Sequence, residues 1–207
     1  MRKALLFFAV LALLAAPLLA TTITVKSDAT NQGAAVGSTS DPRLTSGDIS
    51  GLTFTPVGTD NLGTFTQPPP GSPSGTIVVQ VPPECGYYCG QSGFVLATFT
   101  LPSTFSSISL SGAGNVDDWG YAFLNGTAIS PQLDEFGNVT FNTSNPALFL
   151  PGLNTLVISD SNAGGGPSGV AFFADITYSS TPEPSSLLLL GTGLLGAVGA
   201  IRRRINL

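Results

Sequence analysis

The amino-acid sequence predicts an all-β body, an antiparallel β-sandwich, with a signal helix before it and a short transmembrane helix after it. Three observations carry this prediction: short apolar blocks recur along the middle of the chain, turn-forming residues separate them, and no long amphipathic helix interrupts them. Each end of the chain instead has an apolar run beside basic residues. The chain therefore divides into residues 1–20, 21–180 and 181–207.

The first segment, residues 1–20, has the pattern of a secretory signal peptide. The pair Arg2-Lys3 precedes an apolar run over residues 4–16, and Ala20 provides a small residue at the expected cleavage site. Cleavage is expected after Ala20, but the third residue before the cut is Leu18 rather than alanine, so the site can shift by a few residues. We expect export through a translocon and removal of this segment by signal peptidase.

The body, residues 21–180, has the length of one domain with its own core. From Val170 to Tyr178 every second residue is apolar or aromatic, which predicts a strand with one buried face. The dipeptide Asn125-Gly126 is typical of a two-residue type I′ hairpin. The blocks that most clearly predict strands cover residues 76–81, 94–101, 107–110, 121–124, 138–141, 153–158 and 170–178.

The charge of the body excludes several functions. It has two basic residues, Lys26 and Arg43, against eleven acidic ones, which gives a net charge of −9 and excludes nucleic-acid binding. The chain has no histidine, so the usual general base of serine and cysteine hydrolases and most zinc ligand sets are missing. We therefore expect a protein that is not an enzyme.

Cys85 and Cys89 are the two cysteines of the chain. Because an exported protein reaches an oxidising compartment, we expect them to form a disulfide that closes a small loop.

Paired carboxylates occur at Asp117-Asp118 and at Asp134-Glu135. A glycosidase needs two such groups across a cleft, but neighbouring residues on a strand point to opposite faces, so we interpret these acids as turn formers rather than catalysts. No cofactor is expected beyond a structural calcium ion, for which Asn115, Asp117 and Asp118 offer hard oxygen ligands.

Trp119, the one tryptophan, lies beside this acidic pair and close to Tyr121. Aromatic rings next to carboxylates are typical of carbohydrate-binding faces, so Asp117, Asp118, Trp119 and Tyr121 form a candidate ligand-binding set. The alternative is that Trp119 fills the core of the sandwich.

The C-terminal segment, residues 181–207, combines Pro182-Glu183-Pro184, an apolar run from Leu187 to Ile201, and Arg202-Arg203-Arg204. The two prolines disfavour a helix upstream, and the uncharged run that follows predicts a membrane helix with its arginines on the cytoplasmic side. The run has fifteen residues, about 22 Å of helix against about 30 Å of hydrocarbon, so the predicted membrane helix is short.

These three features in this order resemble the PEP-CTERM sorting domain of Gram-negative bacteria. The resemblance covers about an eighth of the chain and identifies Pro182, Glu183, Pro184, Arg202, Arg203 and Arg204 as the sorting signal. It implies that an exosortase, a membrane-embedded cysteine transpeptidase, processes the tail near Pro-Glu-Pro. It further implies release or re-attachment of the protein at the cell surface, often together with exopolysaccharide. The alternative is an ordinary single-pass anchor.

Part of the body is similar to galactose-binding-like domains. The similar segments are residues 117–126, which end in Leu-Asn-Gly, residues 151–156 with the pattern Pro-Gly-x-Asn-x-Leu, and the glycine-rich stretch 163–169. The resemblance implies a jelly-roll-type sandwich, which often binds carbohydrate at its loop tips and sometimes holds a structural calcium ion.

The sequence therefore predicts an exported, non-enzymatic protein of the cell surface or extracellular matrix that associates with exopolysaccharide. Two alternatives remain open: a carbohydrate-active enzyme or accessory module that uses the acidic residues, and a structural or adhesive matrix component without a defined ligand.

Overall fold

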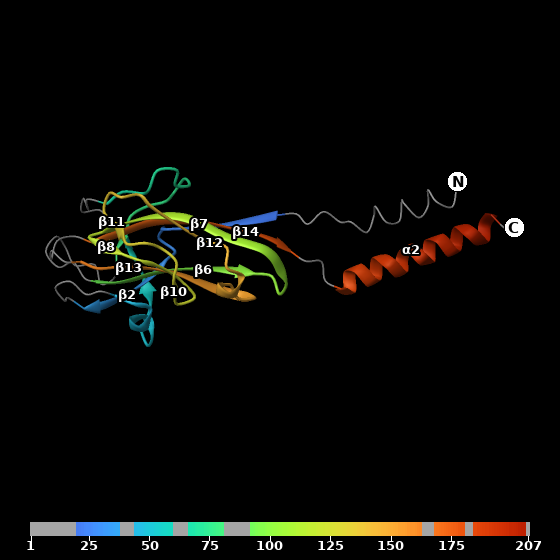
Figure 1. Ribbon diagram of the computed structural model, residues 1–207, viewed down its shortest axis with the longest axis horizontal. Helices are drawn as coiled ribbons and strands as arrows, with labels where there is room; N and C mark the ends of the chain where they lie inside the picture. The colour runs from blue at the N-terminus through green and yellow to red at the C-terminus, as the bar shows by residue number, and fades with distance from the viewer. Residues whose placement is uncertain are drawn as a thin grey trace.

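A computed structural model describes residues 20–37, 44–59, 66–80, 92–162, 168–180 and 184–205. Within these ranges, two six-stranded antiparallel sheets pack face to face, and a two-stranded ribbon lies at one end of the pair (Figure 1). The predicted antiparallel β-sandwich is confirmed.

The first sheet has the strand order β12-β7-β14-β5-β4, and β1 also pairs with β14. Its members are β1 (Ala20–Lys26), β4 (Gly58–Thr59), β5 (Val79–Gln80), β7 (Phe105–Asp117), β12 (Val139–Thr143) and β14 (Gly169–Ser180).

The second sheet has the order β10-β9-β13-β6-β2-β3. Its members are β2 (Gln32–Gly37), β3 (Thr55–Pro56), β6 (Ser92–Leu101), β9 (Ala122–Leu124), β10 (Thr127–Ala128) and β13 (Gly152–Asp160). The ribbon pairs β8 (Trp119–Gly120) with β11 (Leu133–Asp134), and two short 3-10 helices, η1 (Ser46–Ile49) and η2 (Pro146–Leu148), lie in connections.

Strand β14 confirms the predicted alternation. Val170, Phe172, Ala174 and Ile176 are fully buried between the sheets, and Tyr178 packs against the same core at its edge. A continuous cluster of apolar side chains from both sheets fills this space, with Phe141, Leu156 and Ile158 among its fully buried members.

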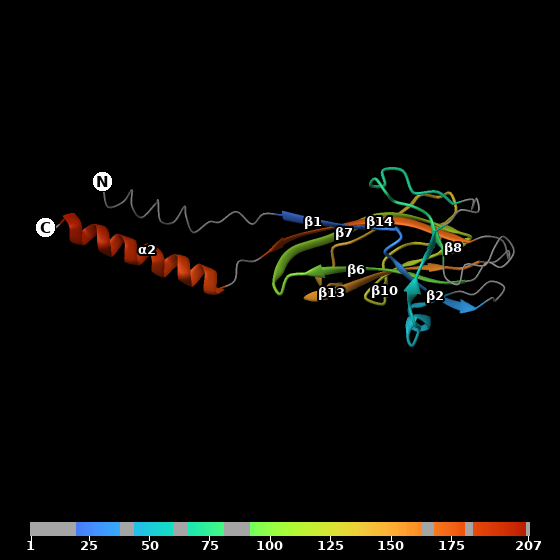
Figure 2. The ribbon, with the colours of Figure 1, turned by 180° about the vertical axis from the view of Figure 1, so that it is seen from behind.

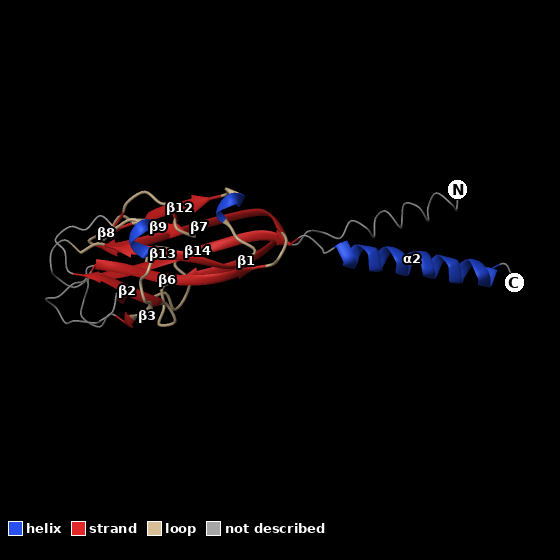
Figure 3. Ribbon diagram, turned by 90° about the horizontal axis from the view of Figure 1, so that it is seen from below, coloured by secondary structure: helices blue, strands red, loops and turns tan. Residues whose placement is uncertain are grey.

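A second, smaller cluster covers the outer face of the second sheet. Leu44, Phe94, Phe123 and Val157 form its buried part, and Tyr121 packs against its edge. Leu44 comes just before η1, and Ile49 of η1 packs against the same cluster, so the segment that contains η1 covers this face of the sheet. We call these side chains the lid cluster. Figure 3 shows the strands of both sheets together with the short helices in their connections.

Strand β7 continues well beyond the block that the sequence predicts as a strand. The expected strand over residues 107–110 extends to Asp117 and includes Gly112 and Gly114. A Cβ atom at Gly112 would overlap the Phe173 carbonyl and approach the Phe141 ring to 2.8 Å. These glycines therefore permit close packing inside a long strand, rather than marking its end.

Strand β1 was not predicted, yet it pairs with β14 over its whole length. Its register runs from Ala20 opposite Ser179 to Lys26 opposite Phe173. The start of the body and the exit of the chain toward the C-terminal helix therefore lie side by side at one end of the sandwich (Figure 2).

The predicted C-terminal helix is confirmed as α2 (Pro184–Ile205), which lies beyond the end of the sandwich (Figure 1). The expectation of a transmembrane helix needs correction, because no helix in the described ranges combines the length and the apolar character that a membrane crossing requires. The physical reason is the short apolar run: serines precede it and Arg202, Arg203 and Arg204 follow it directly.

Some predictions concern residues outside the described ranges. They are the signal helix over residues 1–19, the disulfide between Cys85 and Cys89, and the first two residues of the Pro182-Glu183-Pro184 signature. These remain predictions.

Candidate functional site

Two asparagines connect the segments on which the galactose-binding-like resemblance rests. Asn125 and Gly126 have φ angles of 48° and 82°, which confirms the type I′ hairpin between β9 and β10. The Asn125 side chain donates to the Leu148 carbonyl and to Oδ1 of Asn154, each at 2.8 Å, and accepts from the Thr155 amide at 2.9 Å.

Asn154 completes this network from strand β13. Its fully buried side chain accepts from the Leu150 amide at 2.8 Å and donates to the carbonyls of Leu150 and Gly152 at 2.8 Å and 3.0 Å. The side-chain amides of Asn125 and Asn154 thus use all their donors in joining strand ends. These two side chains hold the fold together and have no donor left for a ligand.

Acidic residues gather at the end of the sandwich where β7 passes into the ribbon. Carboxylate oxygens of Asp117, Asp118 and Glu135 lie within 4.8 Å of one another. Asp117 ends β7, Asp118 lies between β7 and β8, and Glu135 follows β11, which pairs with β8 through Asp134 opposite Trp119. The ribbon thus brings together acids that are far apart in the sequence.

This arrangement corrects the sequence-based expectation for the Asp117-Asp118 pair. Adjacent residues on a regular strand point to opposite faces, but β7 ends at Asp117, so this alternation does not extend to Asp118. Carboxylate oxygens of both aspartates lie in the same cluster.

A fourth carboxylate, that of Asp160, lies at the end of β13 and is completely buried. Its Oδ2 accepts a hydrogen bond from the Ser168 hydroxyl, and its Oδ1 has no hydrogen-bond partner among the described residues. Burial raises the pKa of Asp160 well above its usual range; the Ser168 hydrogen bond opposes this, and the nearby charges of Asp117 and Asp118 add to it.

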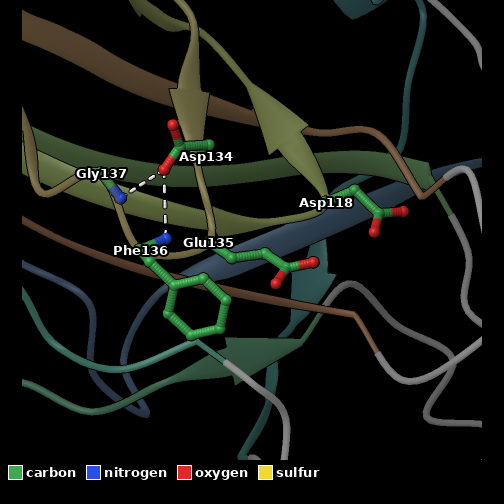
Figure 4. Close-up of a pocket in the computed structure, with 5 residues that line it drawn as sticks. All are labelled: Asp118, Asp134, Glu135, Phe136 and Gly137. Atoms are coloured by element: carbon green, nitrogen blue, oxygen red, sulfur yellow. Dashed lines mark hydrogen bonds between the residues drawn. The ribbon is translucent and has the colours of Figure 1, made fainter.

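An open pocket of about 470 Å³ lies beside the cluster, lined by Asp118, Asp134, Glu135, Phe136 and Gly137. In Figure 4, the carboxylates of Asp118 and Glu135 lie on the same side of the pocket, with the Phe136 ring below them. The Phe136 side chain is 64% exposed. Asp134 instead turns back onto its own loop and accepts from the backbone amides of Phe136 and Gly137.

The aromatic residues of the predicted set do not line this pocket. Trp119 is half-buried on β8, so it is neither a fully buried core ring nor a wall of the pocket. Tyr121 packs against the lid cluster, and its hydroxyl lies 3.4 Å from Oε1 of Gln132. Of the four predicted ligand-binding residues, the pocket contains Asp118.

Asn115, the third predicted calcium ligand, serves a structural role. Its Nδ2 donates to the Gln67 carbonyl and to Oδ1 of Asn138, and its Oδ1 accepts from the Asn138 amide, all at 2.9 Å. Asn138 has a φ of 46°, so this pair of amides fixes a left-handed residue just before β12. Asn115 therefore ties the loop that contains Gln67 to β7.

Sequence reasoning missed Glu135 as a partner of Asp118, and missed Phe136 and Asp160 altogether. The available signal was the tetrapeptide Asp134-Glu135-Phe136-Gly137, in which a large apolar residue occurs inside a turn sequence. No comparable signal marks Asp160, because a carboxylate at the end of an apolar strand is typical of a strand end that is exposed to solvent.

Comparison with known proteins identifies the C-terminal segment. Residues 180–204 match the model of the PEP-CTERM protein-sorting motif, so the chain carries this motif where its sequence predicts it. In the structure, Pro184 begins α2, and the arginines Arg202, Arg203 and Arg204 lie in its last turn, where positive charge is favourable. No curated protein matches the chain.

The body is distantly similar to solved glycosidase structures. One is β-glucuronidase from Ruminococcus gnavus in complex with C6-substituted uronic isofagomine (15% identity, TM-score 0.41), with 78% of this chain and 30% of that chain covered. Another is a putative β-galactosidase from Bacteroides fragilis (13% identity, TM-score 0.43), with 75% and 23% covered. This chain spans less than a third of either protein, and so distant a likeness says nothing about its activity or ligand.

Proposed function

We propose that this chain is an exported, non-enzymatic protein that an exosortase-type system sorts to the cell surface or extracellular matrix of a Gram-negative bacterium, where its jelly-roll-type body associates with exopolysaccharide. The observation that carries the proposal is the match of residues 180–204 to the PEP-CTERM sorting motif. The signal-peptide pattern at the other end supports the same route.

The junction between body and tail supports processing. Strand β14 ends at Ser180 and α2 begins at Pro184, so the first two residues of the Pro-Glu-Pro signature fall between the two elements and the third opens the helix. A cut in this junction separates the helix from the body without removing any residue of β14. The sandwich therefore keeps all its strands after processing.

The pocket beside Asp118 supports an association with polysaccharide. An exposed ring such as Phe136 stacks on the apolar face of a sugar, and the carboxylates of Asp118 and Glu135 accept hydrogen bonds from its hydroxyls. Because the body has a net charge of −9, we propose neutral or amine-bearing glycans rather than uronic or sulfated ones.

Mass spectrometry of the mature C terminus tests the sorting proposal. In cells that contain an exosortase, the wild-type chain should end near Pro182, Glu183 and Pro184, and replacement of these three residues by alanine should leave the tail in place. Deletion of residues 205–207, which lie outside the matched motif, is the control and should not affect processing. An intact Leu207 on the wild-type protein at the cell surface would refute the proposal.

Binding of the full-length chain to a glycan array tests the association with polysaccharide. The wild-type protein should bind neutral or amine-bearing glycans, and Phe136→Ala should reduce the affinity by about tenfold or more, as expected for loss of a stacked ring. Asn142→Ala, a change at an exposed residue of β12, should leave binding unchanged. Absence of binding to every glycan would favour the structural matrix component.

A second candidate function is a carbohydrate-active enzyme. The observation that favours it is the approach of the Asp118 and Glu135 carboxylate oxygens to within 4.8 Å, since retaining glycosidases place their two carboxyl groups about 5–5.5 Å apart. Turnover of a bound polysaccharide that Glu135→Gln abolishes would establish this alternative. Binding without turnover would support the non-enzymatic proposal.

A further inference from the structure

Both sheets end together on the side of the sandwich from which the C-terminal helix leaves. In the first sheet, Ser180 at the end of β14 lies opposite Phe105 at the start of β7. In the second sheet, Gly152 at the start of β13 lies opposite Leu101 at the end of β6, and residues 102–104 connect Leu101 to Phe105. We call this end of the body, which faces α2 in Figure 2, the tail-side end.

A short connection keeps α2 close to the tail-side end. Residues 181–183 lie between Ser180, the last residue of β14, and Pro184, the first residue of α2. Four steps of at most about 3.6 Å each place these two residues no more than about 14 Å apart. Apolar side chains of α2, among them Leu195 and Ile201, are exposed, so the body does not cover them. A lipid surface that receives these side chains is therefore within reach of the tail-side end.

Large apolar side chains are also exposed on the tail-side end itself. Leu150, in the turn between η2 and β13, is 50% exposed, and Leu153, at the start of β13, is 63% exposed. Phe105 and Tyr178 are half-buried at the neighbouring strand ends of the first sheet. Apolar surface of this kind gains free energy when it leaves water for an apolar medium.

The turn that presents Leu150 is held firmly by the asparagine network. The Asn154 side chain bonds both the amide and the carbonyl of Leu150, each at 2.8 Å, and Asn125 bonds the Leu148 carbonyl at the same distance. Because this turn is fixed before any contact forms, insertion of its leucine costs little additional conformational entropy.

The tail-side end also lacks charge. No aspartate, glutamate, lysine or arginine occurs in the segments that form it, which are residues 20–25, 98–110, 139–154 and 176–181. The acidic cluster of Asp117, Asp118 and Glu135 lies at the other end of β7, whose thirteen residues extend over about 40 Å. This separation exceeds the screening length of about 10 Å at 0.1 M salt. The cluster therefore does not repel an anionic surface that touches the tail-side end.

We propose that the tail-side end is a docking surface for a lipid bilayer, on which the body stands with Leu150 and Leu153 among the headgroups while the tail is attached. The inference rests on the proposed sorting route, in which the chain is membrane-associated before processing. Lipid is the occupant because α2, close by, presents uncovered apolar side chains to the same surface. The pocket beside Asp118 and Phe136 then faces away from the membrane.

A tryptophan at the tail-side end reports on contact with lipid. The full-length chain is purified from a host without an exosortase and mixed with vesicles of phosphatidylethanolamine and phosphatidylglycerol that contain brominated acyl chains. In a Trp119→Phe background, the emission of Leu153→Trp should fall by about twofold or more, as expected for an indole among headgroups. Val36→Trp in the same background is the control, because Val36 is an exposed residue near the opposite end of β6, and its emission should be unchanged.

Vesicle partitioning measures what the two leucines contribute in the presence of the native tryptophan. Leu150→Ser combined with Leu153→Ser should weaken partitioning of the full-length chain by about tenfold or more, since both apolar side chains are lost. The same loss should occur on vesicles of phosphatidylcholine alone, because apolar insertion needs no anionic headgroup. Val36→Ser is the matched control and should partition as the wild type does. Circular dichroism checks that each variant keeps its strands.

Either measurement alone overturns the proposal: equal quenching at positions 153 and 36, or wild-type partitioning of the double serine variant. Self-association without lipid that the serine changes abolish would assign the surface to a second copy. Normal partitioning together with impaired processing in cells would assign it to the transpeptidase. The vesicle experiments contain no exosortase, so an intact Leu207 in cells that contain one would count against the proposed sorting function alone.

Discussion

Gly120 shows how closely the ribbon approaches the second sheet. A Cβ atom at this position would overlap the backbone carbonyl of Ser159. The same contact region includes the Tyr121 amide, which donates to Oγ of Ser159 at 2.8 Å, and the Ser159 amide, which donates to the Tyr121 carbonyl at 2.9 Å. Position 120 therefore requires glycine, because the Ser159 backbone leaves no room for a side chain.

We therefore expect Gly120→Ala to destabilise the protein by about 2–4 kcal/mol, because backbone rather than a flexible side chain must move. Urea unfolding followed by circular dichroism measures the change. Gly47→Ala is the matched control, since its nearest neighbour would lie at 3.5 Å, and its cost should stay below about 1 kcal/mol. Equal costs for the two variants would contradict this account.

The asparagine network makes a second prediction at single residues. Asn154→Ala removes a fully buried side chain and leaves the partly buried Leu150 amide and carbonyl without their partner, which should cost about 2–4 kcal/mol of unfolding free energy. Asn142→Ala, at an exposed position of β12, should change it by less than about 0.5 kcal/mol.

A double-mutant cycle with Asn125→Ala measures the coupling. Because the two side chains share a direct hydrogen bond of 2.8 Å, we expect a coupling energy of about 1 kcal/mol. Strict additivity would show that the two asparagines act independently.

At the scale of elements, the register of β1 constrains where the signal peptide ends. Strand β1 starts at Ala20, and pairing with β14 extends to Lys26. The buried residue of the strand is Val25, so a cut beyond it would remove both the pairing and an apolar contact of the core.

We therefore expect the mature protein to start at Thr21 or within a few residues of it, and not after Val25. Mass spectrometry of the N-terminal peptide provides the measurement. Leu18→Ala creates a small residue at the third position before the cut and should give a single start at Thr21. A wild-type start after Val25 would contradict a structural role for β1.

Several strands could be predicted from the sequence because their apolar residues alternate locally. This holds for β14 and for the β9–β10 hairpin, where Asn125-Gly126 has the required positive φ angles. Strand β1 was missed because its threonine-rich edge buries little apolar surface, and the end of β7 was missed because glycines that permit packing resemble turn formers.

At the scale of the whole molecule, the body is strongly acidic. Eleven acidic side chains against two basic ones give residues 21–180 a net charge of −9. Repulsion among these charges destabilises the compact state. Salt weakens this repulsion, since the screening length falls from about 30 Å at 0.01 M to about 10 Å at 0.1 M.

The Tm of the full-length chain should therefore rise by a few degrees between 0.01 M and 0.2 M sodium chloride. A chelator is present throughout, so that traces of calcium do not contribute. Calorimetry or a thermal-shift assay measures the Tm. A fall in Tm over this range would show that attractive pairs outweigh the repulsion.

The sequence by itself determined the route of this protein and the class of its fold. The sorting motif is a contiguous segment, and strand alternation is local, so neither depends on distant contacts. Only the tertiary structure decided the candidate site. The carboxylates of Asp117, Asp118 and Glu135 meet because β11 pairs with β8, and such long-range pairing leaves no local pattern along the chain.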